Sequence, residues 1–489
     1  LGTFEGVVQL KESIISGNYR FHFYTNWMNN FKEDESFEHS IEIINKKENY
    51  QLTNKDADYK SASISVYPES GILLKDIKNA VGVRVKDCND IGIQIPKATV
   101  FDSKGNVIVS FFTNKMGYGR FDFTPVPNET YIVKITSDKL SLSQALPAVQ
   151  NSGLVISPND NLPDNVLEVS VNTNESSVAL HQNKNYTLVV HQNGNLVQKS
   201  FNFNDKNASQ TINFDKSTLS NGVNTIRIID ENNNQIGERL IYINKLPKAI
   251  PQLEAQLTSA ENVTLFGKLE SQNANLSISV LPSETVSLSQ NNSILGTFFL
   301  NAYLEKPEQN NFSYFDLANK YRANDLELLM LSKAKSKYEW HNILMSKPKE
   351  TYAFTKGVTI SGTVVKELNP KTKYKVALIS IKNNIFEEAP VDKNNKFSFE
   401  NFFAQDYTAY TLELMDEANK PIETKIATNI LFGDQAFNKK LVFETTNCTP
   451  TKATNYTFAF KSPTDGNSLK EVTVKNTYKK PVMIHEKES

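Results

Sequence analysis

Short alternating runs of apolar and polar residues, separated by turn-forming residues, recur along almost the whole chain. Alternation with a period of two is typical of strands that bury one face. A single core seldom serves more than roughly 250 to 300 residues, so this 489-residue chain needs several cores. Many short strands joined by turn signals favour sandwiches in series. The sequence therefore predicts a mainly β protein of consecutive immunoglobulin-like β-sandwich domains.

One hairpin pattern is written three times in the chain. Each copy has an apolar pair, an aspartate, a polar turn that bears Asn or Gly, and a return strand. The aspartate can accept hydrogen bonds from amides of the turn, and Asn or Gly can adopt a positive φ, so each copy can form locally. Such repetition indicates several similar modules. The copies are VFDSKGNVIVSF from Val100, IIDENNNQIGERLIYI from Ile228 and LMDEANKPIETKIATNI from Leu414.

One region departs from the strand pattern. Residues 291–306 and 324–344 place apolar side chains at helical spacing. We expect a helical hairpin, about 291–345, inserted beside a β-domain. Its opening turn is apolar nearly all round, which favours burial, either against a sandwich of the same chain or against a partner.

Polar or proline-bearing joints near residues 50, 148, 248, 350 and 448 divide the chain. The first residues read as mid-strand, so we expect them to be the end of a sandwich that starts further upstream. The predicted divisions are the end of a sandwich (1–50), two sandwiches (51–148 and 149–247), a β-domain with the helical insertion (248–353), a fourth sandwich (354–447) and a tail (448–489).

Bulk charge and cysteine content exclude several classes of protein. Charged residues make up 22% of the chain with a net charge of -1, so nothing indicates nucleic-acid binding or attraction to an anionic membrane. No apolar run reaches the length of a membrane helix. Cys88 and Cys448 lie far apart and cannot build a disulfide framework or a zinc site. Two separate thiols are favoured over one long-range bridge.

A search for motifs of catalysis or metal binding finds none. The six histidines contain no His-Glu-x-x-His pair, and His181 and His191 read as two separate histidines on a strand surface. There is no Gly-x-Ser-x-Gly elbow, phosphate loop or dinucleotide fingerprint. We therefore assign no catalytic residue, no metal ligand and no cofactor, and we favour a binding or scaffolding role.

Aromatic residues are concentrated in GNYRFHFYTNWMNNF, residues 17–31. Tyr19, Phe21 and Phe23 lie on one side of an expected strand, and Trp27 and Phe31 are expected to fold over its end. Burial in a core is the favoured reading, with exposure of Trp27 to a partner as the alternative. Trp and Tyr dominate the hot spots of interfaces. Four aromatic side chains are candidate partner anchors: Trp27, Phe31, Tyr338 and Trp340.

Several segments together resemble the envelope proteins of Bacteroidota that carry alpha-2-macroglobulin-like sandwich domains and then a carboxypeptidase-regulatory-like, or transthyretin-like, domain. Ser70 departs from the family's Pro-Glu-Gly-Gly element, and residues 333–336 replace its Gln-Gly-Trp-Arg. The macroglobulin thioester motif is absent, so protease trapping is not implied. The segments that carry the resemblance are 17–31, 64–87, 114–125, 325–340, 356–365, 392–402 and 468–476, the last resembling the lead into a TonB receptor plug.

The resemblance implies an exported, non-enzymatic protein associated with the outer membrane, at the cell surface rather than in the periplasm. Its implied partners are outer-membrane proteins such as a TonB-dependent transporter and associated lipoproteins. One alternative is a carbohydrate-binding protein that feeds a glycan importer. Another is a glycosidase, which would need two facing carboxylates about 5 to 10 Å apart.

Overall fold

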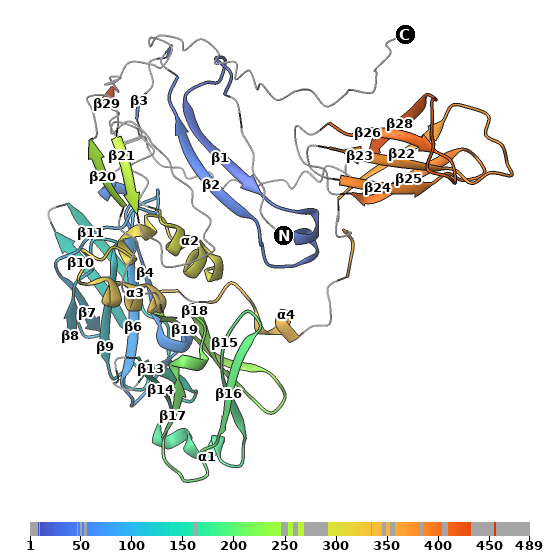
Figure 1. Cartoon of the computed structure of the whole chain (residues 1–489). Coiled ribbons are helices and arrows are strands. Elements are labelled where there is room, and N and C mark those ends of the chain that lie inside the picture. The colour runs from blue at the N-terminus through green and yellow to red at the C-terminus, as the bar shows by residue number, and fades with distance from the viewer. Residues whose placement is uncertain are drawn as a thin grey trace.

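Three β-sandwiches, a strand hairpin and a group of short helices make up the computed structural model (Figure 1). This confirms the expected mainly β class with sandwich domains in series. The structure describes residues 8, 10–45, 47–48, 51–52, 56–137, 139–160, 162, 165–245, 253–257, 263–267, 292–333, 335–344, 349–352, 357–381, 385–402, 409–431 and 454–455. The expected tail beyond residue 455 lies outside these residues.

The first sandwich packs a three-stranded sheet against a four-stranded one, all antiparallel. Val81, Val83 and Val85 alternate along one strand and are fully buried in its core. A short parallel pair, β5 (Leu73–Leu74) with β12 (Val149–Gln150), lies beside it. The sheets are β4 (Ser63–Pro68), β6 (Asn79–Lys86) and β9 (Tyr118–Phe123), and β11 (Leu140–Ala145), β10 (Tyr131–Ser137), β7 (Ala98–Asp102) and β8 (Val107–Phe111).

The second sandwich repeats this strand order. In both, the first, second and fifth long strands form the small sheet, and the remaining four form the large one. Its core holds Val169, Leu188 and Ile226, all fully buried. The sheets are β13 (Val155–Asn159), β14 (Val166–Asn172) and β17 (Ser209–Asp215), and β16 (Asn195–Phe201), β15 (Tyr186–Gln192), β18 (Gly222–Ile229) and β19 (Gln235–Ile243), with α1 (Val178–His181) between β14 and β15.

The third sandwich has three and four strands in a different order. Its first strand, β22, lies between the fourth and the last instead of at an edge. Val376 and Leu378 are fully buried in its core. The sheets are β25 (Lys396–Phe402), β22 (Val358–Val364) and β28 (Ile426–Leu431), and β24 (Ile385–Pro390), β23 (Lys375–Ser380), β26 (Thr411–Met415) and β27 (Pro421–Ile422).

The three repeated turns form hairpins as predicted. Asp102 accepts hydrogen bonds from the amides of Lys104 and Asn106 at 3.0 and 2.8 Å between β7 and β8. Asp230 and Asp416 do the same between β18 and β19 and between β26 and β27. Each aspartate accepts hydrogen bonds from the amides two and four residues further on. The aspartate that recurs in the sequence pattern therefore stabilises each turn.

The N-terminal hairpin pairs β1 (Gly17–Phe23) with β2 (Phe37–Ile43), and the turn between them contains η1 (Asn26–Asn30). Tyr19, Phe21 and Phe23 share one face, as the alternation predicts. They are only half-buried, and Phe37 on the same face is 46% exposed. The expectation that these rings fill a core is therefore wrong for the described residues, where β1 and β2 pair only with each other.

The predicted helical hairpin consists instead of short helices. α2 (Ile294–Phe299) ends where Asn301 turns away to bond the backbone of Glu308. α3 (Arg322–Leu331) ends at Ser332, and α4 (Trp340–Leu344) follows after an irregular stretch. We call residues 292–344 the helical wedge. The 3-10 turns are η2 (Tyr59–Ser61), η3 (Glu69–Gly71), η4 (Glu175–Ser177), η5 (Lys216–Thr218), η7 (Asn301–Tyr303) and η8 (Asn311–Tyr314).

The helical wedge packs on the first two sandwiches at once. Leu329 and Met330 of α3 are fully buried in one cluster with Tyr118 of β9 and Leu240 of β19. A Cβ on Gly82 of β6 would lie only 2.7 to 3.1 Å from atoms of Ser332 and Leu331, so β6 and α3 are in close contact. Two further strand pairs are described: β20 (Leu253–Leu257) with β21 (Val263–Gly267), and β3 (Gln51–Leu52) with β29 (Thr454–Asn455).

The cysteine prediction needs correction. Cys88 is disulfide-bonded, whereas two separate thiols were the favoured reading. Cys448, the other cysteine of the sequence, lies outside the described residues. Spacing along a chain says little about distance in a multi-domain fold, which is why the sequence favoured the wrong alternative.

Candidate functional site

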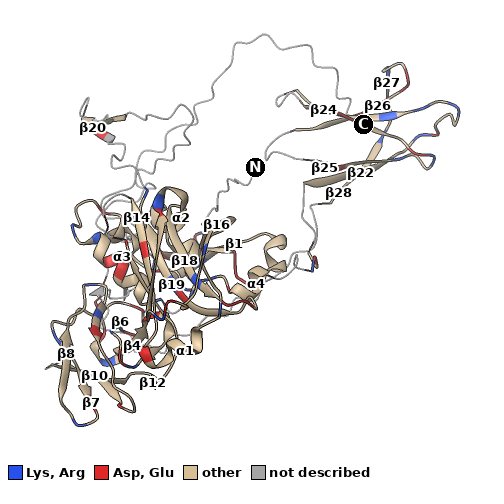
Figure 2. Ribbon diagram, turned by 90° about the horizontal axis from the view of Figure 1, so that it is seen from below, with Lys and Arg blue, Asp and Glu red and all other residues tan. Residues whose placement is uncertain are grey.

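The most distinctive group of polar residues lies in the joint, the region where the first two sandwiches meet the helical wedge. Arg84 of β6, Arg227 of β18 and Arg239 of β19 are each less than 9% exposed. The strand neighbours of Arg84 and Arg227 point into the sandwich cores, so the alternation of a strand turns these two arginines toward the wedge. Arg239 is held differently, through ion pairs with Glu69 of η3 and Glu327 of α3. Figure 2 shows charged residues where α3 lies close to the strands.

The first cluster joins the first sandwich to the wedge through Glu308, which is 3% exposed. Its carboxylate accepts from Arg84 Nη1 at 2.9 and 3.2 Å, from Lys333 Nζ at 3.1 Å and from the Tyr118 hydroxyl at 2.7 Å. The Arg84 guanidinium also lies 4.2 Å from the centroid of the Tyr118 ring. A buried carboxylate needs this many donors because desolvation penalises its charge.

The second cluster connects the first sandwich, the second sandwich and the helical wedge. Arg239 of the second sandwich bonds Glu69 of the first sandwich at 3.1 Å. It also pairs with Glu327 of α3. Burial raises the pKa of Glu69, and the Arg239 guanidinium opposes that rise. One arginine of the second sandwich therefore pairs with a carboxylate of the first sandwich and with a carboxylate of the wedge.

The third cluster surrounds Arg227, which is fully buried. Its guanidinium donates to His191 Nε2 at 2.9 Å and to Ser336 Oγ at 2.7 Å, and it pairs with Glu238. The Trp340 ring centroid lies 5.8 Å from it. Ser336 lies outside any helix and forms an isolated β-bridge with Leu304, and its contact with Arg227 competes with continuation of α3 beyond Leu331.

The histidine pair does not lie on a strand surface as expected. His191 is on β15 but is 7% exposed, and burial together with Arg227 lowers its pKa to about 4. It stays neutral near pH 7 and accepts the hydrogen bond from Arg227. His181 lies in α1 with Nδ1 at 2.9 Å from the Tyr186 hydroxyl.

A second set of contacts ties the N-terminal hairpin to the end of the wedge. Glu35 pairs with Lys337 at 3.3 Å and accepts from the Tyr338 hydroxyl at 3.2 Å. The Asn30 side chain bonds the backbone of Thr351 and Tyr352 three times, at 2.8 to 2.9 Å. The hairpin turn thus holds the stretch of chain that precedes the third sandwich.

The four candidate anchors have different surroundings. Trp340 is 9% exposed, packs with Val189 and Ile229, and donates its indole N–H to the Asn233 carbonyl at 3.1 Å. This burial removes Trp340 from the surface, so its role as a partner anchor is not supported. Tyr338 is half-buried and held by Glu35.

The other two anchors lie together at the tip of the N-terminal hairpin. Trp27 is half-buried and meets Phe31 edge-on, with 6.2 Å between the ring centroids. Phe31 is 41% exposed. Of the four, Phe31 has the most accessible ring.

The charged groups of the joint face one another across the sandwiches and the wedge. Within the described residues, no group of three or more His, Cys, Asp or Glu side chains could hold a metal ion. In the same residues, no helix is both long and apolar enough to cross a bilayer. Fold and joint together define a multi-domain β-sandwich protein whose first two sandwiches are locked by a helical wedge.

Comparison with known proteins adds no family. No protein-family model and no curated protein matches the chain. A tetra-tandem repeat from the extending region of a large adhesion protein covers 86% of this chain and 83% of its own, at 11% identity and a TM-score of 0.16. The FN1 to FN3 domains of chicken CNTN1 cover 76% and 98%, at 10% identity and a TM-score of 0.13. A β-glucuronidase of Parabacteroides merdae covers 37% and 25%, at 10% identity and a TM-score of 0.15.

Proposed function

We propose that this chain is a non-enzymatic scaffold of a Bacteroidota envelope complex, associated with the outer membrane at the cell surface. In this proposal it accompanies a TonB-dependent transporter or another outer-membrane assembly and its lipoproteins. The observation that carries the proposal is the joint, where buried ion pairs hold two sandwiches and the helical wedge in one arrangement. A rigid body of this kind presents outer surfaces at fixed spacing, as a scaffold requires.

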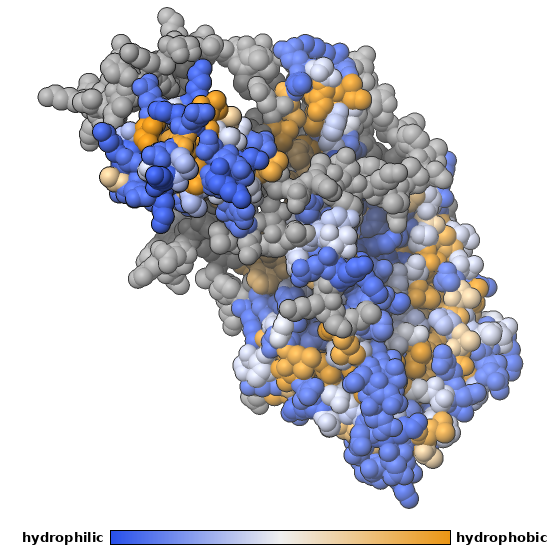
Figure 3. Space-filling model, turned by 90° about the vertical axis from the view of Figure 1, so that its right-hand side faces the viewer, coloured by the Kyte–Doolittle hydropathy of each residue, from blue (hydrophilic) through white to orange (hydrophobic). Residues whose placement is uncertain are grey.

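Exposed apolar side chains supply the surfaces for such a role. Phe31 is 41% exposed at the hairpin tip, Phe112 is 68% exposed beyond β8, and Phe298 is 63% exposed on α2. Figure 3 shows separate apolar areas within a hydrophilic surface on one face of the molecule. Aromatic side chains in this setting are typical of interface anchors.

The disulfide bond at Cys88 supports export. Disulfides persist in oxidising compartments, including the bacterial periplasm and the cell surface, and are rare in the cytosol. A maleimide probe should react with the unfolded protein only after reduction. Labelling of unreduced protein isolated from cells would contradict this support for export.

Cross-linking in a Bacteroidota host tests the proposal directly. The full chain, tagged and expressed in that host, should recover an outer-membrane transporter from envelope fractions. Phe31→Ala should lower the recovery at least about threefold, since a hot-spot truncation costs 1 kcal/mol or more. Phe386→Ala is a matched aromatic control, since Phe386 is 58% exposed on β24 of the third sandwich, away from the hairpin. Recovery of no outer-membrane protein with the wild-type chain would refute the scaffold role.

A further inference from the structure

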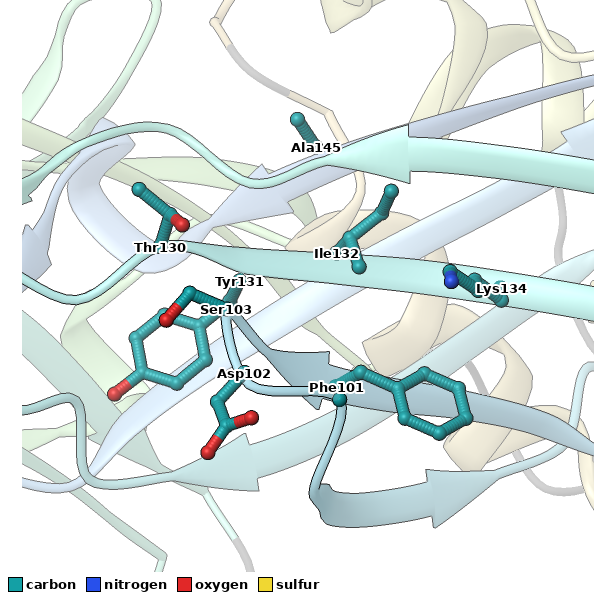
Figure 4. A pocket seen from close by; sticks show the side chains of 9 residues that line it. Phe101, Asp102, Ser103, Thr130, Tyr131, Ile132, Lys134 and Ala145 are labelled. Atoms are coloured by element: carbon teal, nitrogen blue, oxygen red, sulfur yellow. The ribbon is translucent and has the colours of Figure 1, made fainter.

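A concavity of about 330 Å³ lies on the outer face of the four-stranded sheet of the first sandwich (Figure 4). Its lining comes from β7, β10 and the end of β11, with the turn after β7 at one side. Ligand sites begin at about this size, which suits a single ring rather than an extended molecule.

The floor of the concavity is an apolar row across three strands. Phe101 of β7 pairs with Ile132 of β10, and Ile132 pairs with Ala145 of β11. Their neighbours Val100 and Val133 are fully buried in the core, so the row points away from it. The sheet therefore exposes a row in which Ile132 lies between the Phe101 ring and Ala145, a platform with no role in the core.

The rim carries polar groups of both signs. Lys134 Nζ lies 5.4 Å from the centroid of the Phe101 ring, and Lys134 makes no ion pair within the described residues. At the opposite end, the Asp102 carboxylate and the Thr130 side chain line the concavity. Hydrogen bonding by Asn106 lowers the pKa of Asp102, so this carboxylate is ionised at neutral pH.

The Asp102 carboxylate keeps acceptor capacity for a ligand. Oδ1 accepts the amides of Lys104 and Asn106, whereas among the described residues Oδ2 accepts one hydrogen bond, from the Asn106 side chain at 2.9 Å. Each carboxylate oxygen has two acceptor sites. The concavity therefore offers a hydrogen-bond acceptor at one end, a cationic donor at the other and a ring between them.

We propose that this concavity binds one hexose residue of a neutral glycan chain. The apolar C–H face of a hexose stacks on the Phe101 ring. Its hydroxyls, which both donate and accept, bond Asp102 Oδ2 at one end and Lys134 Nζ at the other. A neutral sugar is favoured over a uronate because Asp102 and Glu129, a carboxylate that holds the amides of Ser103 and Thr130, lie at the turn side.

The site is independent of the scaffold role. It would give the first sandwich a carbohydrate-binding function, the alternative to a scaffold. Its affinity is expected to be weak, with a Kd of roughly 0.1 to 1 mM, because one ring contributes few contacts. Such sites gain strength when several copies act on one polymer. The concavity has room for one ring, so it predicts one weak binding event at this position of the chain.

Titration calorimetry of the full chain tests the proposal with defined probes: maltohexaose, cellohexaose, mannohexaose and, as an acidic comparison, tri-galacturonate. At least one neutral oligosaccharide should bind, and Phe101→Ala should weaken it about tenfold or more. Lys134→Gln should weaken it about threefold or more, and this exposed position is expected to leave the thermal melt unchanged. Lys139→Gln is the matched control, since Lys139 Nζ lies 5.8 Å from the Tyr59 ring centroid in the same type of contact outside the concavity.

Three results would overturn the hexose site. These are no binding of any neutral probe by the wild-type protein, equal loss of binding in Lys134→Gln and Lys139→Gln, or tighter binding of tri-galacturonate than of every neutral probe. None of them bears on the cross-linking experiment, because Phe31 lies on the N-terminal hairpin and Phe101 on the first sandwich. Failure of the hexose site and failure of the scaffold role are therefore separate outcomes.

Discussion

The first two sandwiches and the third contain the same number of strands but are stabilised differently. In the first two, Arg84 and Arg239 reach the buried carboxylates of Glu308 and Glu69 across the joint. Arg227 bonds His191 of its own sandwich and reaches Ser336 of the wedge. Among the described residues of the third sandwich, the only ion pair is Lys375 with Glu388, and these side chains are 27% and 36% exposed. The difference shows that similar sandwich cores can serve either as parts of one body or as a separate unit.

Strand order contributes to this contrast. In the first two sandwiches the strand that begins the domain lies at a sheet edge, whereas β22 of the third lies in a sheet centre. β6 and α3 are packed closely enough that Gly82 has no room for a side chain. The third sandwich instead follows a stretch of chain that Asn30 holds. We therefore expect the locked pair to unfold as one unit and the third sandwich as another.

Removing a buried arginine should have the largest effect on this contrast. Arg227→Ala leaves Glu238 beside an empty site and takes a donor from His191 and Ser336, so the free energy of unfolding of the locked pair should fall by about 3 to 5 kcal/mol. Lys375→Ala in the third sandwich is the control and should cost no more than about 1 kcal/mol. Chemical denaturation followed by circular dichroism measures both. Equal losses in the two variants would mean that the joint is not the source of stability.

Truncating a core leucine should lower the free energy of unfolding by a similar amount in the locked pair and in the third sandwich. The region in which hydrogen exchange becomes faster should differ between the two variants. Leu329→Ala and Leu378→Ala each remove a fully buried side chain, which costs about 2 to 5 kcal/mol. Leu329 belongs to a cluster that includes both of the first two sandwiches, so hydrogen exchange should accelerate in both. Leu378→Ala should accelerate exchange only in the third sandwich. Faster exchange confined to α3 in Leu329→Ala would contradict the idea of one locked body.

Acid should weaken the locked pair through His191. Its pKa is about 4 in the folded protein against 6.5 for an ordinary histidine, so below pH 6.5 the unfolded chain binds more protons than the folded one. The contribution of neutral His191 is complete above pH 6.5 and is lost as pH falls toward 4, at up to about 3 kcal/mol. His191→Gln should flatten this part of the pH dependence, and Lys184→Gln should not. A wild-type slope that His191→Gln leaves unchanged would assign the effect to carboxylates.

The alternation and turn signals were sufficient to predict the class of fold and the three hairpins. The reason is that both act locally: an aspartate bonds amides two and four residues away, as Asp102 does. The joint was not predicted, although a signal was present. Arg84 stands within VGVRV and Arg227 within TIRII, and an arginine inside an apolar strand needs a buried partner.

The partners of those arginines could not be found from the sequence. Glu308 is 224 residues from Arg84, and nothing in the local pattern connects them. The helical spacing of 324–344 predicts one long helix, but the structure has two short ones, α3 to Leu331 and α4 from Trp340, because the contacts of Ser336 with Arg227 compete with helix formation between them. The sequence predicted that Trp340 is a partner anchor, but tertiary contacts bury its side chain in the fold.

The smallest expected effect concerns the contact between the hairpin turn and the chain before the third sandwich. Asn30→Ala removes the acceptor of the Thr351 and Tyr352 amides, a loss of about 1 kcal/mol in local stability. Exchange of these two amides, measured by NMR, should accelerate about five- to tenfold while global unfolding stays nearly unchanged. Asn29→Ala is the neighbouring control, because the Asn29 side-chain nitrogen has no hydrogen-bond partner within the described residues. If Asn30→Ala left exchange at Thr351 unchanged, the Asn30 side chain would not restrain the stretch of chain that precedes the third sandwich.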